Sequence, residues 1–519
     1  MAQDVAKEDP KVIFADAEFF FAREEYADAL YEYMRLYEDG YKFSGNVNYR
    51  MGICYLNIPG KKEMAVSHLL AAIKNTTNDY KEGSLNEKNV PLDGFLYLGN
   101  AYRVNNQFDK AVEAYTTYLQ LSGYQPGVNT VYAKQQVTAC NEAKKQINNP
   151  VNYSFTNLKE PINGANNNFA PVVSANGKVM VYMNQLAFYT AIYYTTKDDN
   201  GWAEPINITP QVQSDGNQVA TGLSADGTQL LLSVENDFDA NIWISTFKDG
   251  VWSVSKSLPG DINSKYWESH ASFSPDGSTI YFASNRNTET EMDIYTATFD
   301  GEEWSGAVRL GNNINTALNE DSPFVSPDGK RLYFSSQGHN SMGGYDIFYC
   351  EKDANGGWSR PINVGYPLNT SDDDLFYMPL DGNQGYLASI RPGGLGREDI
   401  YLVNENPGPA VEDQAGNTMN QEAEKPATIA ETHVAEEETT ATTKEETSTE
   451  KPYSPKEITL SPIYFTFDSY SLDNNSLDKI RKVAVVMNEY PEITTRLVGY
   501  TDSIGDPTYN LELSNKRAN

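Results

Sequence analysis

Cysteine and histidine are scarce in this sequence of 519 residues, and long apolar runs are missing. The three cysteines, Cys54, Cys140 and Cys350, lie far apart and lack the spacing of a metal site, so we interpret them as buried free thiols rather than as partners in a disulfide. The four histidines are scattered and form no zinc motif. No run reaches the roughly 18 apolar residues that a membrane helix needs. The sequence therefore predicts no metal, no cofactor and no transmembrane segment.

Positive charge is also in short supply. Lysine and arginine number 40 against 71 aspartates and glutamates, which gives a formal net charge of −31. Because nucleic acids and anionic membrane surfaces are bound through basic patches, this balance argues against both. We expect no nucleic-acid partner.

Motifs of hydrolases and of calcium sites are missing as well. The nearest approach to a Gly-x-Ser-x-Gly nucleophile elbow is Gly338-His-Asn-Ser-Met-Gly343, whose spacing is wrong. The acidic run Asp372-Asp-Asp374 lacks the alternating spacing of a calcium loop. We therefore predict a protein that is not an enzyme.

A chain of this length is too long for one core, and its internal repeats predict several domains. The first repeat places small residues and aromatics at fixed helical positions in residues 95–119: Leu98, Gly99, Tyr102, Ala111, Tyr115 and Tyr118. Partial copies include Met51-Gly52 with Tyr55 and Ala65, and Tyr26 with Ala29. The pattern resembles the tetratricopeptide repeat, which implies an all-α array over residues 8–148 with a groove for partner proteins. A plain helical spacer is the alternative.

The second repeat is longer and more regular. A turn with Asp-Gly or Asn-Gly recurs every 50 to 53 residues, at Gly177, Gly227, Gly277, Gly329 and Gly382. Such pairs suit tight hairpin turns that need a positive φ, and an alternating strand follows each of them. The units resemble PD40 repeats, the β-propeller blades also found in TolB. We predict an all-β propeller with five blades over residues 151–404.

The ends of this repeat predict how the ring closes. The fifth unit ends at Val403 without the tryptophan strand of the other four, while residues 158–163 match residues 202–207 and 358–363. We expect a strand before the first blade to complete the last one, which would leave no open sheet edge.

A polar residue lies nine positions before each turn glycine: Asn168, Gln218, Glu268, Glu320 and Asp373. Equivalent positions of the five blades converge on the axis, so these side chains are candidates for a polar, mostly acidic ring at the propeller mouth. A cation or a basic loop of a partner would bind there. In the alternative, which we favour, each residue caps its inner strand or bridges to the next blade.

Composition changes sharply after the propeller repeats. Glutamate, threonine, alanine and proline dominate residues 405–455. Such a stretch buries too little apolar surface to offset the entropy of ordering it, so we predict a disordered acidic linker that serves as a tether.

Residues 456–519 alternate strand and helix patterns and end in a dense motif. The motif comprises Gly499-Tyr500-Thr501-Asp502-Ser503-Ile504-Gly505, Tyr509-Asn510, Leu513-Ser514 and Arg517-Ala518. It resembles the OmpA C-terminal, peptidoglycan-binding family, an α/β domain of which only the first half is recognisable here. The resemblance implies that Asp502 takes the ammonium group and Arg517 the carboxylate of diaminopimelate, with Thr501 in support. In the alternative, Asp502 caps a turn and Arg517 is a solvated helix residue.

The order of these modules resembles a group of Bacteroidetes envelope proteins typified by PorE of the type IX secretion system. This resemblance implies a periplasmic scaffold at the outer membrane that holds peptidoglycan while the helical repeats and the propeller dock envelope proteins. It also implies a signal peptide that is missing from this sequence and a C-terminal domain that is cut short. The alternative is an envelope sensor whose propeller binds a small ligand or cation.

Overall fold

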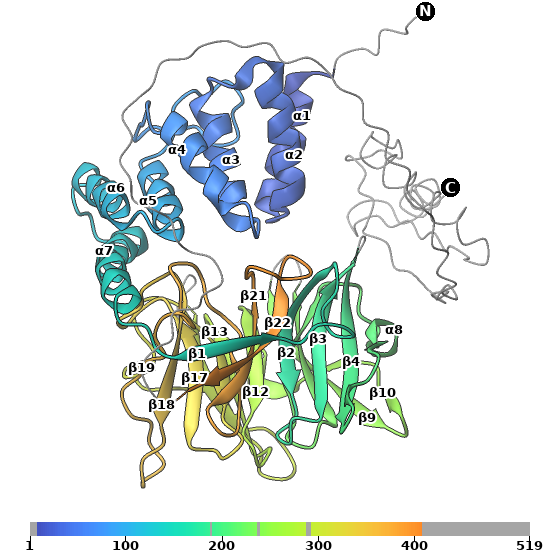
Figure 1. Cartoon of the computed structure of the whole chain (residues 1–519). Coiled ribbons are helices and arrows are strands. Elements are labelled where there is room, and N and C mark those ends of the chain that lie inside the picture. The colour runs from blue at the N-terminus through green and yellow to red at the C-terminus, as the bar shows by residue number, and fades with distance from the viewer. Residues whose placement is uncertain (1–7, 187–188, 236–238, 287–291, 407–519) are drawn as a thin grey trace, which may run out of the picture. The chain divides into compact units, whose positions relative to one another are not determined.

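The computed structural model describes residues 8–186, 189–235, 239–286 and 292–406. All of them belong to one unit of the chain, Met1–Glu412. Helices occupy the N-terminal part of this unit and strands the remainder (Figure 1). This order confirms a helical region followed by a β-propeller.

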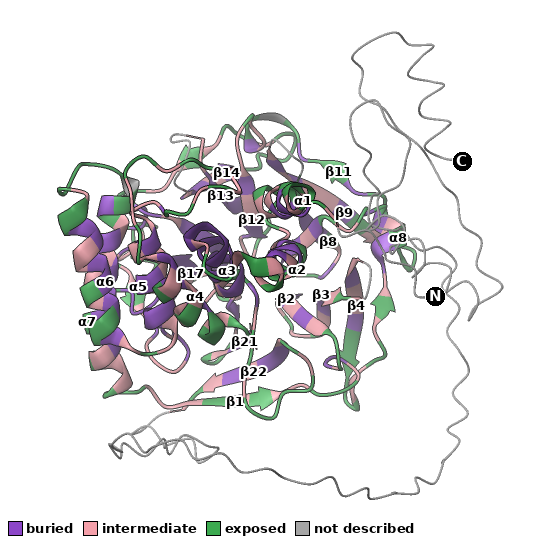
Figure 2. Ribbon diagram, turned by 90° about the horizontal axis from the view of Figure 1, so that it is seen from above, coloured by how far each residue is buried: buried purple, intermediate pink, exposed green. Residues whose placement is uncertain are grey.

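The helical region consists of seven α-helices and two short irregular turns. They are α1 (Pro10–Ala22), α2 (Tyr26–Leu36), η1 (Tyr37–Tyr41), α3 (Gly45–Asn57), η2 (Lys62–Met64), α4 (Ala65–Ala72), α5 (Gly94–Val104), α6 (Phe108–Leu121) and α7 (Val128–Ile147). Local sequence sets some of these starts: Asp9 accepts a hydrogen bond from the backbone of Lys11, and Ser44 accepts one from that of Val47. Helix α3 is buried along nearly its whole length (Figure 2).

Small residues let these helices approach one another closely. A Cβ atom at Gly99 of α5 would lie 2.4 Å from the ring of Tyr115 on α6, and one at Gly52 of α3 would lie 2.5 Å from Leu69 on α4. Ala111 is fully buried in the same core. The glycines and alanines that the sequence singled out are therefore contact positions between helices. That the region is a tetratricopeptide array stays a prediction.

The strands form five antiparallel sheets, each one a blade. The first four blades are β2 (Asn167–Val173) to β6 (Ile206–Asn207), β7 (Gln218–Leu223) to β11 (Lys256–Ser257), β12 (Glu268–Phe273) to β15 (Val308–Arg309), and β16 (Glu320–Val325) to β19 (Ile362–Asn363). The intervening members are β3 (Val179–Gln185), β4 (Thr190–Asp198), β5 (Gly201–Trp202), β8 (Gln229–Glu235), β9 (Ala240–Lys248), β10 (Val251–Trp252), β13 (Thr279–Ser284), β14 (Asp293–Thr298), β17 (Arg331–Ser336) and β18 (Asp346–Glu351). Helix α8 (Thr209–Val212) and the turn η3 (Gly260–Ile262) lie between blades.

The fifth blade closes the ring in the predicted way. It contains β20 (Met378–Leu380), β21 (Gln384–Ser389) and β22 (Asp399–Glu405), and its outermost strand is β1 (Tyr153–Asn157) from before the first blade. Strands β1 and β22 pair in antiparallel fashion, with Phe155 opposite Val403. The 158–163 motif itself is not the closing strand: β1 ends at Asn157, and the motif forms a turn directly after it.

The hairpin turns also follow the prediction. Every turn glycine has a positive φ, from +67° at Gly177 to +76° at Gly227. In the third blade, Ser274 donates to the carboxylate of Asp276 at 2.6 Å, and that carboxylate accepts the backbone N–H of Ser278 at 3.1 Å. These local hydrogen bonds explain why the Ser-x-Asp-Gly sequence recurs at this place in the repeat.

Candidate functional site

Four of the five predicted mouth residues occupy equivalent places in the structure. Asn168, Gln218, Glu268 and Glu320 lie on the innermost strands β2, β7, β12 and β16, and all four are buried. Asp373 lies on a loop before β20 and is exposed. Four buried polar side chains therefore form the ring. Asp373 does not belong to it, so another residue must hold the fifth position.

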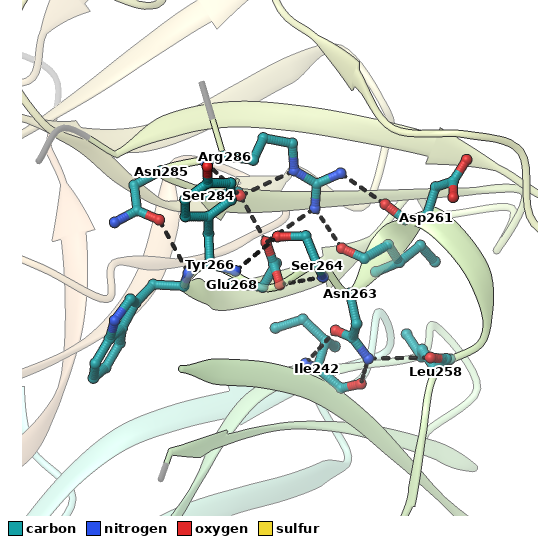
Figure 3. Close-up of polar contacts among 12 residues, drawn as sticks. Ile242, Leu258, Asp261, Asn263, Ser264, Tyr266, Glu268, Ser284, Asn285 and Arg286 are labelled. Atoms are coloured by element: carbon teal, nitrogen blue, oxygen red, sulfur yellow. Dashed lines mark hydrogen bonds and ion pairs between the residues drawn. The ribbon is translucent and has the colours of Figure 1, made fainter. Parts of the chain in front are cut away.

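Glu268 fastens the connection between the second and third blades (Figure 3). Ser264 donates to it from its backbone nitrogen (2.7 Å) and from its hydroxyl (2.6 Å), and Ser284 on the neighbouring strand donates at 2.8 Å. Arg286 donates to the same carboxylate at 3.1 Å and also to the backbone oxygen of Asp261 at 2.7 Å. Both carboxylate oxygens of Glu268 are thus used in holding the connecting loop against its strand.

Glu320 makes the same contacts one blade further on, but all of its hydrogen-bond donors are neutral. Thr316 donates from its backbone nitrogen and its hydroxyl, each at 2.7 Å, and Ser336 donates at 2.6 Å. Burial raises the pKa of Glu320 to about 7, and the hydrogen bonds from Ser336 and Thr316 offset only part of that effect.

This raised pKa predicts a pH-dependent stability. Between its unfolded-state pKa and about 7, native Glu320 holds a proton that the unfolded chain has lost, so its stabilising contribution declines as pH rises toward 8. Glu320→Gln cannot titrate. We expect the free energy of unfolding of this variant, relative to the parent, to increase by about 2 to 3 kcal/mol from pH 5 to pH 8. Urea denaturation followed by tryptophan fluorescence measures it.

An exposed acid provides the control for that measurement. Glu302→Gln removes the same formal charge from the surface of the third blade, so its stability relative to the parent should stay nearly constant over the same pH range. Equal pH profiles for Glu320→Gln and Glu302→Gln would contradict the assignment.

The fifth ring position belongs to Asp374 rather than to Asp373. Thr370 donates to Asp374 from its backbone nitrogen at 2.5 Å and from its hydroxyl at 3.1 Å, which repeats the pattern of Thr316 with Glu320. Burial holds the pKa of Asp374 well above its usual range. Counting back from the turn glycine failed because the fifth blade has one residue fewer: eight separate Asp374 from Gly382, where nine separate the other ring residues from theirs.

That difference in length can be located. The strand irregularity itself is kept in the fifth blade, because the second residue after the ring position has a positive φ in all three cases: His270, Ser322 and Phe376. The missing residue lies beyond that point, since seven positions separate His270 and Ser322 from their turn glycines and six separate Phe376 from Gly382. Counting forward from Thr316 and Thr370, four residues to the acid in both blades, would have found the correct residue.

The two amide members of the ring also bond to neighbouring groups of the propeller. Asn184 donates to Asn168 at 2.8 Å, and Ser255 donates to Gln218 at 3.5 Å. Such contacts fit the alternative in which each ring residue caps its inner strand or bridges to the next blade. Binding of a cation or a partner loop at these residues stays a prediction.

A set of asparagines that the sequence reasoning missed joins neighbouring blades at four of the five junctions. The side chain of Asn263 accepts from the backbone nitrogen of Ile242 at 2.7 Å and donates to the backbone oxygen of the same residue at 2.9 Å (Figure 3). The same pair of bonds joins Asn315 to Ile294, Asn369 to Ile347 and Asn163 to Ile400. Their constant place in the repeat, five residues before the ring position, is the signal that could have found them.

Deeper along the inner strands, His270 of β12 contacts Asp321 of β16. The imidazole Nδ1 lies 2.7 Å from Asp321 Oδ1, Ser269 donates to both oxygens of the same carboxylate at 3.2 Å, and Phe376 packs edge-on against the imidazole. His270 sits at the irregularity of its strand with φ +30°, which redirects its side chain. Within the described ranges, no group of three or more His, Cys, Asp or Glu could hold a metal ion.

Two loops of the fourth and fifth blades contact the helical region. We call residues 338–345 and 370–374 together the socket. Arg103 of α5 enters it: the guanidinium donates to the backbone oxygen of Ser371, and the residue is only 3% exposed. Burial disfavours the charged form, but Tyr115, Tyr132 and the carboxylates of Asp373 and Asp372 outweigh that cost and raise the pKa of Arg103.

Further contacts surround Arg103 at the socket. Lys62 forms an ion pair with Asp372 at 2.7 Å, and Gln135 donates to the backbone oxygen of His339 at 3.0 Å. Met342, a residue of the propeller sequence, is fully buried in the hydrophobic core of the helical region. Residues 338–343 and 372–374, which failed the motif tests for a nucleophile elbow and a calcium loop, therefore hold the helical region and the propeller together.

The remaining predicted site residues, Asp502, Arg517 and Thr501, lie outside the described residues, as does the predicted linker from residue 407 onward. The three cysteines lie within the described residues, and all are buried and free, as predicted. Of the helices in the described part, none is long and apolar enough to cross a membrane.

Comparison with known proteins identifies the C-terminal part of the chain. Residues 464–519 match the sequence profile of the OmpA family. Outer membrane porin F of Pseudomonas aeruginosa is 40% identical over 57 residues, which are 11% of this chain and 16% of that protein, and the Pseudomonas fluorescens porin F is 38% identical over 56 residues, 11% of this chain and 17% of that one. This chain therefore spans about a sixth of the length of these relatives. It carries an OmpA-family domain homologous to theirs.

Solved structures resemble the propeller only distantly. A putative TolB from Agrobacterium tumefaciens is 21% identical, covers 46% of this chain and 73% of its own, and has a TM-score of 0.29. TolB from Acinetobacter baumannii is 17% identical over 54% of this chain and 72% of its own, with a TM-score of 0.31. An α-L-arabinofuranosidase from Podospora anserina is 13% identical, covers 51% of this chain and 100% of its own, and has a TM-score of 0.34. The five-bladed ring rests on the strand pairing itself.

Proposed function

We propose that this protein is a non-catalytic scaffold of the cell envelope that holds peptidoglycan through its OmpA-family domain. The observation that carries the proposal is the match of residues 464–519 to that family, which includes both Asp502 and Arg517. The site that it implies lies in the periplasm, where an outer-membrane-associated protein meets the cell wall.

The chemistry of the ligand explains the choice of these two residues. The free end of a diaminopimelate side chain carries an ammonium group and a carboxylate, so a complementary site needs one anion and one cation on facing walls. Asp502 supplies the anion, and Arg517 supplies a planar guanidinium that can hold a carboxylate through two hydrogen bonds. Thr501, directly before Asp502 in the sequence, is the supporting residue of this proposed site. No covalent step is needed for an anchor of this kind.

The helical region and the propeller are the docking parts of the scaffold. Repeats of both kinds present large surfaces that are independent of the wall-binding site. The socket supports the view that they work as one body, because Arg103, Lys62 and Met342 join them through buried or paired groups. The partners that we propose are other envelope proteins, including components of type IX secretion.

Sedimentation with purified diaminopimelate-type peptidoglycan tests the anchor. We expect the full chain to pellet with the wall, and Asp502→Ala and Arg517→Ala each to weaken binding about tenfold or more, since a hydrogen bond to a charged group is worth about 1.5 to 3 kcal/mol. Asp506→Ala and Arg496→Ala change the same charges at nearby positions and should pellet like the parent. Equal pelleting of the parent and all four variants would contradict the proposal.

A further inference from the structure

A groove of about 430 Å³ lies between the hairpin turns of the fourth and fifth blades. Three of its lining residues are cationic and three are anionic: Lys330, Arg331, Lys352, Asp328, Glu351 and Asp381. Its walls therefore carry no net charge, although the whole chain carries −31. The groove is separate from the socket and from the mouth residues.

Comparison between the blades shows that the fold does not require two of these charges, those of Arg331 and Glu351. The position of Arg331, the second after the turn glycine, holds Val179, Gln229, Thr279 and Gln384 in the other four blades. The position of Glu351, directly opposite on the neighbouring strand, holds Thr196, Thr246, Thr298 and Asn404. All five blades form the same sheet, but only the fourth places a charged pair here. The charged pair of the fourth blade is thus not needed to form a blade.

The guanidinium of Arg331 is positioned but poorly paired. Its cationic carbon lies 4.6 Å from the centre of the Tyr349 ring, which holds the side chain along the groove. Its nitrogens approach Tyr333 at 3.4 Å, Asn383 of the fifth blade at 3.5 Å and Glu351 at 3.6 Å. All three distances are longer than those of strong charged hydrogen bonds. Its donors are therefore available to a carboxylate that enters the groove.

The acidic side of the groove is also set in place. Asp328 accepts from the hydroxyl of Ser326 at 2.7 Å and from the backbone nitrogen of Lys330 at 3.0 Å, and the Lys330 ammonium lies 3.4 Å from it as an exposed ion pair. The Ser326 hydrogen bond lowers the pKa of Asp328, so this carboxylate is ionised at neutral pH. Glu351 remains half-exposed beside Arg331, with 57% of its side chain accessible. A ligand ammonium group would find both carboxylates within the same groove.

We propose that this groove binds a short peptide segment that presents a carboxylate and an ammonium group close together. Arg331, Lys330 and Lys352 hold the carboxylate, while Glu351 and Asp328 hold the ammonium. A purely acidic peptide meets three carboxylates, and a purely basic one meets three cations, so the mixed peptide is the complementary ligand. An exposed cross-strand ion pair contributes at most about 1 kcal/mol to stability, so stability alone does not explain the presence of Arg331 and Glu351.

The repeat itself supplies variants that should fold. Arg331→Gln and Glu351→Thr place in the fourth blade the residues that other blades already carry at these positions. Lys178→Gln is the matched control, because Lys178 follows the turn glycine of the first blade as Lys330 follows that of the fourth. Thermal unfolding of each full-length variant confirms that the propeller is intact.

The probe is an end-capped, fluorescein-labelled hexapeptide of alternating lysine and glutamate, titrated with the full chain and followed by anisotropy. We expect saturable binding that Arg331→Gln and Glu351→Thr each weaken about tenfold, the loss of roughly one charged hydrogen bond, and that Lys178→Gln leaves unchanged. Peptidoglycan sedimentation of these variants should match the parent, which separates this site from the anchor. Absence of saturable binding, or equal affinity of Arg331→Gln and parent, would overturn the proposal. So would equal binding of hexaglutamate.

Discussion

Arg103→Met should lower the free energy of unfolding by about 1.5 to 3 kcal/mol, the usual contribution of a hydrogen bond to a charged group. Methionine fills a similar volume, so the loss measures the guanidinium rather than a cavity. Without it, the backbone oxygen of Ser371 loses its donor, and Asp372 and Asp373 lose the nearby positive charge. The socket should then no longer hold the helical region firmly.

Two optical probes separate the parts of the molecule. All six tryptophans lie between residues 202 and 358, so fluorescence reports the propeller, whereas far-ultraviolet circular dichroism is dominated by the helical region. In urea, the parent should show coincident transitions by both probes, and Arg103→Met should lose its helical signal first. Arg360→Met, which removes an exposed arginine, should change stability by no more than about 0.5 kcal/mol. Coincident and unshifted transitions in Arg103→Met would show that the socket does not couple the two parts.

The propeller could be predicted from the sequence because its signals are local and repeated. A turn glycine such as Gly277 needs a positive φ, and the serine and aspartate before it form hydrogen bonds within a few residues. Five copies of such a turn define five hairpins, and a missing strand at one end of the repeat predicts a donor strand from the other end. The pairing of Phe155 with Val403 follows from that count.

The ring position of the fifth blade could not be read by the same count. Spacing along a strand holds only while the number of residues in it stays constant, and the fifth blade has one residue fewer between its irregular residue, Phe376, and its turn glycine. Asp373 and Asp374 are both acidic, so composition gave no warning. The threonine four residues before the acid is the firmer reference, since its two hydrogen bonds fix that distance.

The socket could not be predicted because it joins residues more than 200 positions apart. Helical spacing does place Arg103 on the same side of α5 as Gly99, whose neighbour Tyr115 is fully buried, so the sequence contains a hint that this arginine points inward. Nothing local indicates that Ser371 completes it. Asp502 and Arg517, which we propose as the wall-binding residues, show the opposite case, because there a dense short motif in the sequence is enough to indicate a site.

Removal of strand β1 should have an effect of similar size on the propeller. We compare a chain that runs from Asn149 to Asn406 with one that runs from Leu158 to Asn406, so that the two differ by β1 and the few residues before it. Tyr153 and Phe155 are half-buried against the last blade, and the guanidinium of Arg391 lies 3.3 Å from the centre of the Phe155 ring. Burial of two such side chains contributes about 3 kcal/mol, to which the lost strand pairing adds.

The shorter chain should therefore melt about 10 °C lower, since 1 kcal/mol shifts the midpoint of a domain of this size by roughly 2 to 4 °C. It should also aggregate more readily, because β22 becomes an open edge. Within the longer chain, Phe155→Ala should reproduce much of the loss, while Thr156→Ala, on the exposed face of the same strand, should not. Equal melting temperatures for the two chains would mean that the ring is held by its core alone, and that pairing of β1 with β22 adds no stability to the propeller.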